Sequence, residues 1–368
     1  MVNSNANAIG IIFPNSYDNL VPELAGDRLM ASIPFAGRYR IIDFLLSSLA
    51  NCGISNIAIV VRENYHSLMD HLGSGRAWDL LRKNGGLSIF PPYAEKNMKV
   101  YSGRVEALES ILPYLRSKKE KYVIMMDANI AVDFDFNAML AEHIESGADV
   151  TVAYTEQEIP AELIRAGSHG DMYYTLKLDD GRVRRIFMNS EMCGKQNLSM
   201  NIYIMDREAL IDKIHAAFVR GSSCFERDIL APRLEKYNIR GYKYDGYYAR
   251  ICGLKSYFDE NMKLLDDENL DALFTGGQIY TKIRDDNPTR YINGCKTKNN
   301  LVADGCVIEG DVENCVLFRG VKIAKGAKIR NSVLMQDTVV NAGARLDYVV
   351  TDKNVTIEVG QELKGTDT

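Results

Sequence analysis

The sequence lacks the features that mark membrane, secreted and nucleic-acid-binding proteins. No apolar run approaches the roughly 18 to 20 residues that cross a bilayer. The polar segment Met1–Ala8 has neither the basic start nor the apolar stretch of a secretory signal. The formal net charge of -5 argues against non-specific binding to nucleic acid, which needs a basic face. We therefore expect a soluble protein of the cytoplasm, with no membrane and no nucleic-acid partner.

Cysteine is also scarce, and its spacing excludes the usual metal and redox motifs. The sequence has 7 cysteines and no CxxC pair, so neither a zinc site nor a redox couple is indicated. We expect the cysteines to pack in the core as small hydrophobic side chains. They are Cys52, Cys193, Cys224, Cys252, Cys295, Cys306 and Cys315.

The first two-thirds of the chain alternate short apolar runs with helical patterns. The residues predict a strand at Ile9–Phe13, a helix at Ile41–Asn51 and a second strand at Ile57–Val61. The alternation continues with a helix at Val105–Leu115, a strand at Tyr122–Met126, a helix at Phe136–Ser146 and a strand at Val150–Tyr154. This order predicts an α/β domain with a mostly parallel sheet, helices on both faces and ligands beyond the carboxyl ends of the strands.

The C-terminal part of the chain carries a repeat. Gly326, Gly343 and Gly360 recur at intervals of 17 residues, close to three hexapeptides. An aliphatic residue stands three positions after each glycine: Ile329, Leu346 and Leu363. Glycine at tight corners and aliphatic residues pointing inward predict a triangular parallel β-helix, with an ordinary β-sandwich as the alternative. The 368 residues thus fit a large domain at 1–274, a linker at 275–300 and a smaller domain at 301–368.

Three segments resemble one known family. They are Ala36–Ser48 (AGRYRIIDFLLSS), Tyr101–Ala107 (YSGRVEA) and Leu198–Tyr203 (LSMNIY). Bacterial ADP-glucose pyrophosphorylases carry closely similar runs, namely Gly-Gly-x-[FY]-Arg-[IL]-Ile-Asp-Phe-x-Leu-Ser, Tyr-Arg-Gly-Thr-Ala-Asp-Ala and Ala-Ser-Met-Gly-Ile-Tyr. The resemblance extends over nearly the whole chain. It implies a Rossmann-like nucleotidyltransferase domain followed by a left-handed parallel β-helix of hexapeptide repeats.

The family transfers AMP from ATP to glucose 1-phosphate and releases pyrophosphate. Its nucleotide loop reads Gly-Gly-x-Gly-Thr-Arg-Leu, and the matching residues are Asn15, Ser16, Tyr17, Asp18, Asn19, Leu20 and Val21. No glycine remains to turn backbone N–H groups onto a triphosphate. Leu20 stands in place of the family's arginine, and Met30 in place of a lysine. The resemblance therefore implies a degenerate nucleotide loop.

The metal site of the family is only half retained. Asp127 matches the first magnesium-binding aspartate, whereas Ile251 stands at the position of the second and cannot ligate magnesium. Capping of a loop is the structural alternative for Asp127. We expect Mg²⁺ to be a cofactor only if residual catalysis exists, and otherwise expect no cofactor.

Some polar residues of the family's sugar-phosphate region remain. Ser199, Met200 and Arg250 form a candidate sugar-phosphate pocket, and the basic pair Arg184 and Arg185 is a further candidate for an anion. Packing or solvated roles are the alternative for all of these. Ser190 aligns roughly with the family's sugar-phosphate lysine, and Asp43 is expected to be structural.

A retained fold with lost chemistry is typical of the regulatory, GlgD-type subunits of this family. We therefore expect a hetero-oligomer, a heterotetramer, with a catalytic paralogue in glycogen biosynthesis, and a sugar phosphate as candidate effector. The alternatives are a weakly active adenylyltransferase and a homomeric sugar-phosphate-sensing scaffold. Acyl transfer, which other hexapeptide β-helices perform with a histidine base, is disfavoured because every histidine precedes the repeat. They are His66, His71, His143, His169 and His215.

Overall fold

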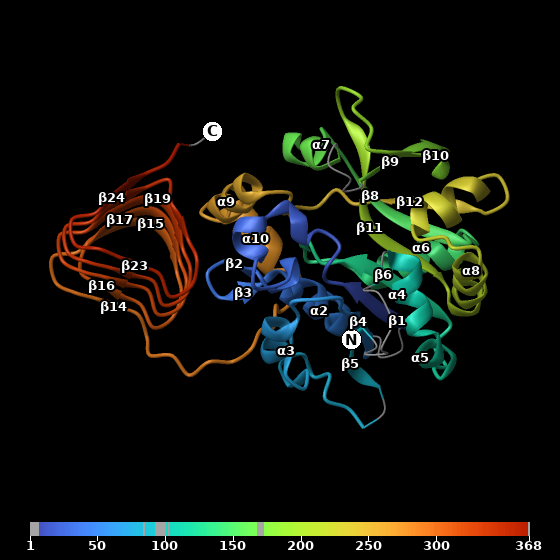
Figure 1. The fold of residues 1–368 in the computed structure, drawn as a ribbon, viewed down its shortest axis with the longest axis horizontal. Helices are drawn as coiled ribbons and strands as arrows, with labels where there is room; N and C mark the ends of the chain where they lie inside the picture. The colour runs from blue at the N-terminus through green and yellow to red at the C-terminus, as the bar shows by residue number, and fades with distance from the viewer. Residues whose placement is uncertain (1–6, 84, 93–100, 102, 168–172, 367–368) are drawn as a thin grey trace.

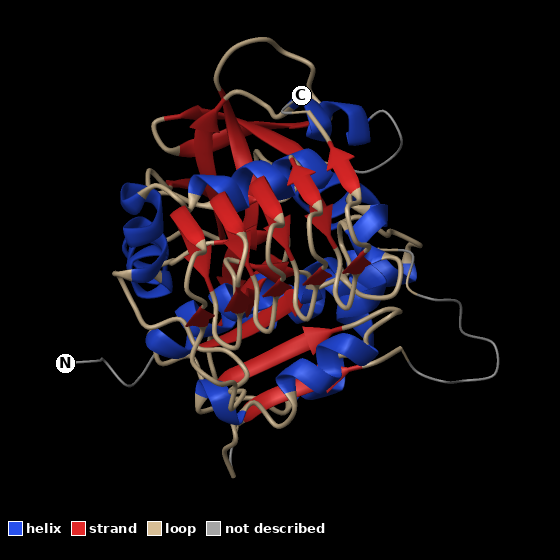
Figure 2. Ribbon diagram, turned by 90° about the vertical axis from the view of Figure 1, so that its left-hand side faces the viewer, coloured by secondary structure: helices blue, strands red, loops and turns tan. Residues whose placement is uncertain are grey.

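The structure is a computed structural model that describes residues 7–83, 85–92, 101, 103–167 and 173–366 (Figures 1 and 2). Ser102 and His169, which belong to patterns named above, lie outside the described residues. An N-terminal α/β domain is followed by a stack of parallel coils, drawn in orange and red in Figure 1. The two-domain organisation agrees with the prediction.

The N-terminal domain is built on one twisted sheet. In spatial order its strands are β5 (Gly86–Phe90), β4 (Asn56–Val60), β1 (Ala8–Phe13), β6 (Tyr122–Asp127), β11 (Gln196–Asp206), β8 (Val150–Gln157), β12 (Ile239–Lys243), β10 (Arg182–Met188) and β9 (Tyr174–Asp179). Pairing from β5 to β6 is parallel throughout, as predicted. The predicted strands in β1, β4, β6 and β8 are confirmed within one to three residues at their ends.

The second half of the sheet departs from the predicted parallel pattern. β11 is antiparallel to both β6 and β8, and β9 pairs antiparallel with β10 and β11. The reason is the short connection between β10 and β11, because antiparallel neighbours need no crossover helix. Asp180 and Gly181, with φ of 49° and 71°, form the tight turn between β9 and β10. The sheet is therefore mixed rather than mostly parallel.

Helices cover both faces of the sheet, as the alternating pattern predicts. Apolar residues of α2 (Ile41–Asn51) and α6 (Phe136–Glu145) pack on one face. The other face is covered by α4 (Arg104–Ser110), α5 (Leu112–Arg116) and α8 (Arg207–Val219). None of the described helices is long and apolar enough to cross a membrane.

The single helix predicted at Val105–Leu115 is wrong. The chain forms α4 and α5 instead, separated at Ile111, whose φ of -103° and ψ of 7° are not helical. Pro113 is the cause, because proline cannot donate an intrahelical hydrogen bond and is tolerated only in the first turn of a helix. α5 begins at Leu112 and so holds Pro113 in that first turn.

Short elements complete the N-terminal domain. They are α1 (Pro22–Ala25), α3 (His66–Leu72), α7 (Ala161–Gly167), α9 (Leu254–Lys263), α10 (Asp267–Phe274), β2 (Pro34–Phe35), β3 (Tyr39–Arg40), β7 (Ile130–Ala131) and β13 (Ala249–Arg250). Five cysteines are buried, as expected, but Cys193 is exposed and Cys295 is half-buried.

The C-terminal coils stack two parallel sheets. One contains β14 (Arg290–Tyr291), β16 (Val307–Ile308), β18 (Lys322–Ile323), β20 (Val339–Val340) and β23 (Thr356–Ile357). The other contains β15 (Lys296–Val302), β17 (Asp311–Leu317), β19 (Lys328–Leu334), β21 (Arg345–Asp347) and β24 (Glu362–Lys364), with β22 (Val350–Thr351) beside β19.

The predicted period of 17 residues is confirmed in the later coils. Ile329 lies opposite Leu346, which lies opposite Leu363. Gly326 and Gly343 occupy the corners with φ of 79° and 72°, a backbone conformation that favours glycine. The left-handed sense of the β-helix stays a prediction.

The predicted linker at 275–300 is too long. β14 already pairs with β16, and β15 with β17, so the coils begin at Arg290 rather than at residue 301. The register from Lys296 to Asp311 is 15 residues, two fewer than the period seen later. This shorter first coil explains why the 17-residue spacing did not reveal it.

The two domains are held together by packing and by polar contacts. α9 packs on the coils through a cluster that includes Tyr257, Val316 and Phe318. Arg28 donates two hydrogen bonds to the Asp352 carboxylate, at 2.8 and 2.6 Å. The remaining linker is also attached, because Ser47 accepts a hydrogen bond from the backbone N–H of Tyr280 at 2.8 Å, and Lys282 pairs with Asp70 at 3.0 Å.

We predict that Ile329→Ala lowers the free energy of unfolding by about 2 to 5 kcal/mol, because Ile329 is fully buried among the coils and its loss leaves a cavity. Chemical denaturation measures the change. Lys328→Ala, at the exposed neighbouring position, is the control and should stay within about 0.5 kcal/mol of the original protein. An equal loss in both variants would contradict the assigned register.

Candidate functional site

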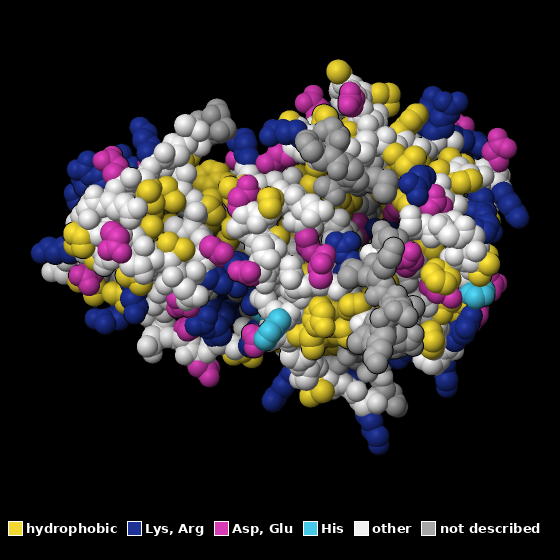
Figure 3. Space-filling view, in the orientation of Figure 1, with side chains coloured by type: hydrophobic (Ala, Val, Ile, Leu, Met, Phe, Trp, Pro, Cys, Tyr) yellow, Lys and Arg dark blue, Asp and Glu magenta, His cyan; other side chains and the backbone are white. Residues whose placement is uncertain are grey.

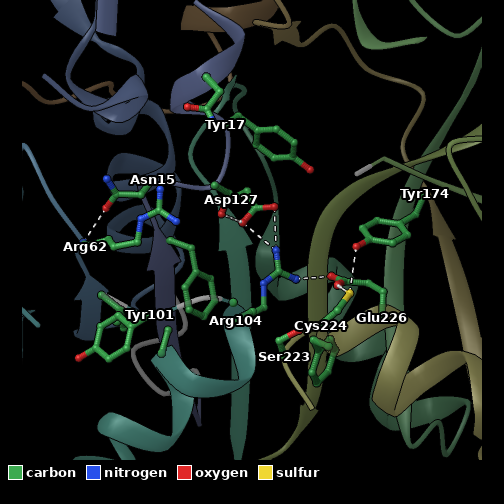
Figure 4. Close-up of a pocket in the computed structure, with 17 residues that line it drawn as sticks. Asn15, Tyr17, Arg62, Tyr101, Arg104, Asp127, Tyr174, Ser223, Cys224 and Glu226 are labelled. Carbon is green, nitrogen blue, oxygen red and sulfur yellow. Dashed lines mark hydrogen bonds and ion pairs between the residues drawn. The ribbon is translucent and has the colours of Figure 1, made fainter. Parts of the chain in front are cut away.

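A cavity of about 280 Å³ opens beyond the carboxyl ends of β1, β4 and β6 (Figure 4). This is the place that the strand order predicts for a ligand. Its walls come from the degenerate loop, the start of α4 and the segment Ser223–Glu226. Asn15, Ser16, Tyr17, Asn19 and Asp127 of the predicted site line it, whereas Asp18, Leu20 and Met30 do not.

The degenerate loop is held in place by its own side chains. The Asn15 amide donates to the Asp18 carboxylate at 2.8 Å, and its oxygen accepts from the backbone N–H of Arg62 at 2.8 Å. Asp18 also accepts from the backbone N–H of Met30 at 2.7 Å. Burial raises the pKa of Asp18, against the lowering effect of these donors. None of the residues from Asn15 to Val21, all described, has a positive φ.

Tyr17 reaches inward to the segment that follows the irregular part of β11. Its hydroxyl accepts a hydrogen bond from the Asn201 side-chain amide. Asn201 has a φ of 56° and stands where the resembled motif has glycine, so it keeps a left-handed backbone and adds a side chain. Tyr17 is buried, and burial raises its pKa. The loop is therefore fastened at both ends of the cavity.

Asp127, at the end of β6, is buried and fully engaged by hydrogen bonds. Both carboxylate oxygens accept from Arg104 Nη2, each at 2.7 Å, and Oδ1 also accepts from the Ser16 hydroxyl at 2.6 Å. The other terminal nitrogen of Arg104 pairs with the buried carboxylate of Glu226 (Figure 4). Arg104 therefore bridges two carboxylates.

Aromatic rings complete the surroundings of this guanidinium. Arg104 lies over the rings of Phe13 and Tyr203, at 5.1 and 5.5 Å from their centres. Burial opposes the charge of Arg104, but the carboxylates of Asp127 and Glu226 outweigh it and hold the Arg104 pKa well above its ordinary value. Burial raises the pKa of Asp127, although Arg104 and Ser16 lower it in part.

The residues present do not fit the magnesium ion that the family resemblance implies. Mg²⁺ requires oxygen ligands with free lone pairs in a near-octahedral arrangement. Asp127 is occupied by Arg104 and Ser16, and the buried Ile251 side chain has no ligating atom. In the part of the chain that the structure describes, no three His, Cys, Asp or Glu side chains are grouped as metal ligands.

The candidate sugar-phosphate residues come together but do not line the cavity. Arg250 Nη2 donates to the Ser199 carbonyl at 2.6 Å, and the Ser199 hydroxyl accepts from the backbone N–H of Asn201 at 3.0 Å. Ser199 and Met200 are each 1% exposed, and Arg250 is 8% exposed. Tyr17 lies between these residues and solvent in the folded chain, close enough for its charge to be coupled to that of Arg250. Sugar-phosphate binding by them stays a prediction.

The remaining candidates lie elsewhere. Arg184 and Arg185 are exposed on β10, where Arg184 pairs with Asp179. The Ser190 carbonyl accepts a hydrogen bond from the Tyr173 hydroxyl at 2.8 Å. Asp43 accepts from the backbone N–H of Arg40 at the start of α2 and lies 2.6 Å from His71 Nε2, which is the structural type of role expected for it.

Two residues of the cavity were missed by the sequence analysis. Arg104 stands in YSGRVEA at the position of the threonine in the family's Tyr-Arg-Gly-Thr-Ala-Asp-Ala, so this substitution was a usable signal. Glu226 lies in a single π-helical turn, Glu226–Leu230, that follows Phe225. No motif marks Glu226, and only the fold brings it to Arg104.

A second cavity, of about 350 Å³, lies where the two domains meet. Six cationic and two acidic side chains line it. We call the cationic set the interdomain basic cluster: Arg38, Arg40, Lys282, Arg284, Arg319 and Lys353. Figure 3 shows Lys and Arg side chains gathered between the domains. Burial, together with the nearby Arg40 and Arg28, lowers the pKa of Lys353 to about 8.

Comparison with known proteins identifies the family. The family described as nucleotidyl transferase matches residues 24–265, and that described as GlmU-like, C-terminal hexapeptide matches residues 285–368. The glycogen biosynthesis protein GlgD of Bacillus subtilis (strain 168) is 33% identical over 98% of this chain and 94% of its own length. The glucose-1-phosphate adenylyltransferases of Bacillus mycoides (strain KBAB4) and Bacillus anthracis are each 32% identical over 90% of this chain and 88% of theirs. The chain therefore belongs to the nucleotidyl transferase family, in the group that includes GlgD and the glucose-1-phosphate adenylyltransferases.

Proposed function

We propose that the chain is a regulatory subunit of a glucose-1-phosphate adenylyltransferase in glycogen biosynthesis, with its own catalysis lost or very weak. The observation that carries this proposal is the geometry of the loop Asn15–Val21. The loop has no positive φ and is fixed by Asn15 and Asp18 in a form that directs a carboxylate, not a nest of N–H groups, to its interior. A triphosphate would meet neither the donors nor the cations it needs.

Adenylyl transfer depends on positioned positive charge around a crowded anionic centre. Leu20 and Met30 stand where the resembled enzymes have an arginine and a lysine. The charge of Arg104 is already balanced by Asp127 and Glu226. Because the loss of one preorganised donor costs about 10²- to 10³-fold in rate, the loss of several should reduce independent turnover to a trace.

The proposed partner is a catalytic glucose-1-phosphate adenylyltransferase of the same organism, in a heterotetramer. Similarity over 98% of the chain to a glycogen biosynthesis protein, and over 90% to adenylyltransferases, supports a role in the same process. A retained fold supports it too, because the coils keep a continuous buried core in a chain whose cavity has lost its cations. We propose that these coils form a left-handed β-helix and take part in assembly.

A phosphorylated effector is the proposed regulatory signal, bound at the interdomain basic cluster. Six cations against two acidic side chains give this cavity an excess of positive charge. Lys353 and Arg40 are both partly buried, so a phosphate there would interact with them in a medium of reduced dielectric constant. Ser199, Met200 and Arg250 remain the alternative pocket, which requires Tyr17 to move.

We predict that the purified chain alone gives no more than trace formation of ADP-glucose from ATP, Mg²⁺ and glucose 1-phosphate. Mixing it with the catalytic paralogue should raise the activity or change the effector response of that enzyme. Pyrophosphate release measures both, and light scattering reports the assembly. Turnover by the chain alone at the level of the paralogue would instead support the weakly active adenylyltransferase. An unchanged paralogue would contradict the regulatory proposal.

We predict that phosphate esters bind more weakly as the pH rises through about 8. Lys353 is charged below its pKa of about 8 and neutral above it, so one cation of the cluster is lost in this window. A phosphate monoester keeps its charge between pH 7 and 9, because its second pKa is about 6. Calorimetry with glucose 1-phosphate and fructose 1,6-bisphosphate measures the affinity. Lys353→Met should bind more weakly at pH 7 and show a flat profile; a falling profile in that variant would assign the titration to another group.

A further inference from the structure

The position of Arg104 invites comparison with a metal ion. Its guanidinium donates to both oxygens of Asp127 at 2.7 Å and to the carboxylate of Glu226 on its other side. Carboxylates on two sides of one cation are the arrangement that a divalent ion adopts in a phosphoryl-transfer site. Here the cation is covalently part of the chain.

The surroundings of Arg104 form a closed socket. Phe13 and Tyr203 present their rings to the guanidinium, and Ser16 occupies the remaining side of Asp127. The Arg104 side chain is 11% exposed, Asp127 is 1% exposed and the Glu226 side chain is 5% exposed. A planar guanidinium matches two carboxylates better than a lysine does, because its donors point in fixed directions.

The backbone brings Arg104 to this position for a visible steric reason. Gly103 precedes it in extended conformation, and a Cβ atom on Gly103 would lie 2.3 Å from the Ser223 carbonyl oxygen. The same carbonyl accepts a hydrogen bond from the backbone N–H of Val105 at 3.1 Å. The start of α4 is therefore held against the segment that carries Glu226.

We propose that Arg104 is a built-in replacement for the divalent cation of the family, and that it excludes metal ions from Asp127. The inference rests on the proposed loss of catalysis and explains it at one atom group. A metal ion would have to displace Arg104 Nη2 from both Asp127 oxygens and would then face a buried positive charge. Removing the guanidinium leaves two buried carboxylates that a divalent cation can neutralise.

The test measures Mn²⁺ binding to the full chain by electron paramagnetic resonance. The original protein should bind no Mn²⁺ that depends on Asp127, so that Asp127→Asn changes nothing. Arg104→Thr should gain one site per chain, and Asp127→Asn in that background should weaken it by at least about tenfold. Arg62→Thr removes an equal charge from the same cavity without touching Asp127, and is expected to gain no site.

Folding is followed in the same samples, because Arg104→Thr leaves two carboxylates without a counter-charge. Thermal unfolding should show this variant destabilised in chelator and restored by Mn²⁺, while the original protein responds to neither. Arg104→Gln, which keeps the length and a donor, provides a second neutral variant. A folded neutral variant that takes no Mn²⁺ overturns the proposal, and so does a variant that Mn²⁺ fails to restore.

The two proposals fail in different ways. An original chain that stimulates its partner yet binds Mn²⁺ through Asp127 overturns the role of Arg104 alone. A chain that excludes Mn²⁺ through Arg104 yet has no effect on a catalytic partner contradicts the regulatory function alone.

Discussion

The ion pair between Arg104 and Asp127 joins parts of the chain that are far apart in the sequence. Asp127 ends β6, Arg104 begins α4, and Ser16 and Glu226 bring the degenerate loop and the turn after Phe225 to the same point. Each of these groups is buried, so each needs the others as partners. The walls of the cavity are thereby fixed relative to one another without any ligand.

Buried charges constrain which changes the site can accept. Removal of one member of a buried ion pair typically costs about 3 to 5 kcal/mol, because the remaining charge is left without a partner. Arg104, Asp127 and Glu226 are therefore coupled, and a change at one position favours compensating changes at the others. A return to metal chemistry would require more than one substitution, since Ile251 also lacks a ligating atom. The loss of the metal site is thus stabilised by the fold itself.

The sequence predicted the fold best where a local rule and the tertiary structure agree. Gly326 and Gly343 mark corners that require positive φ, and the helix Ile41–Asn51 was predicted to the residue. It failed where one residue overrides a pattern, as Pro113 does between α4 and α5. The mixed half of the sheet was foreseeable from Asp180-Gly181, a pair typical of tight hairpins.

The site was predictable only in part. The missing glycines and Ile251 can be read from the resemblance, but the hydrogen bonds that replace them cannot. Asn15, Asp18 and Met30 are brought together by a loop whose path no motif specifies. Glu226 is 122 residues from Arg104 in the sequence, so their pairing is a property of the tertiary fold.

The attachments between the domains have a mechanical consequence. Ser47, Asp70 and Asp352 each hold a residue from the other side of the boundary, so the segment from 275 to 289 is fastened along its course and cannot serve as a free hinge. Any tilt imposed on the coils by a neighbouring subunit is passed through Arg28 to the stretch of chain that ends at Met30, and from there to Asp18. The molecule would then respond to its neighbours as one rigid lever, with the former nucleotide loop at its far arm.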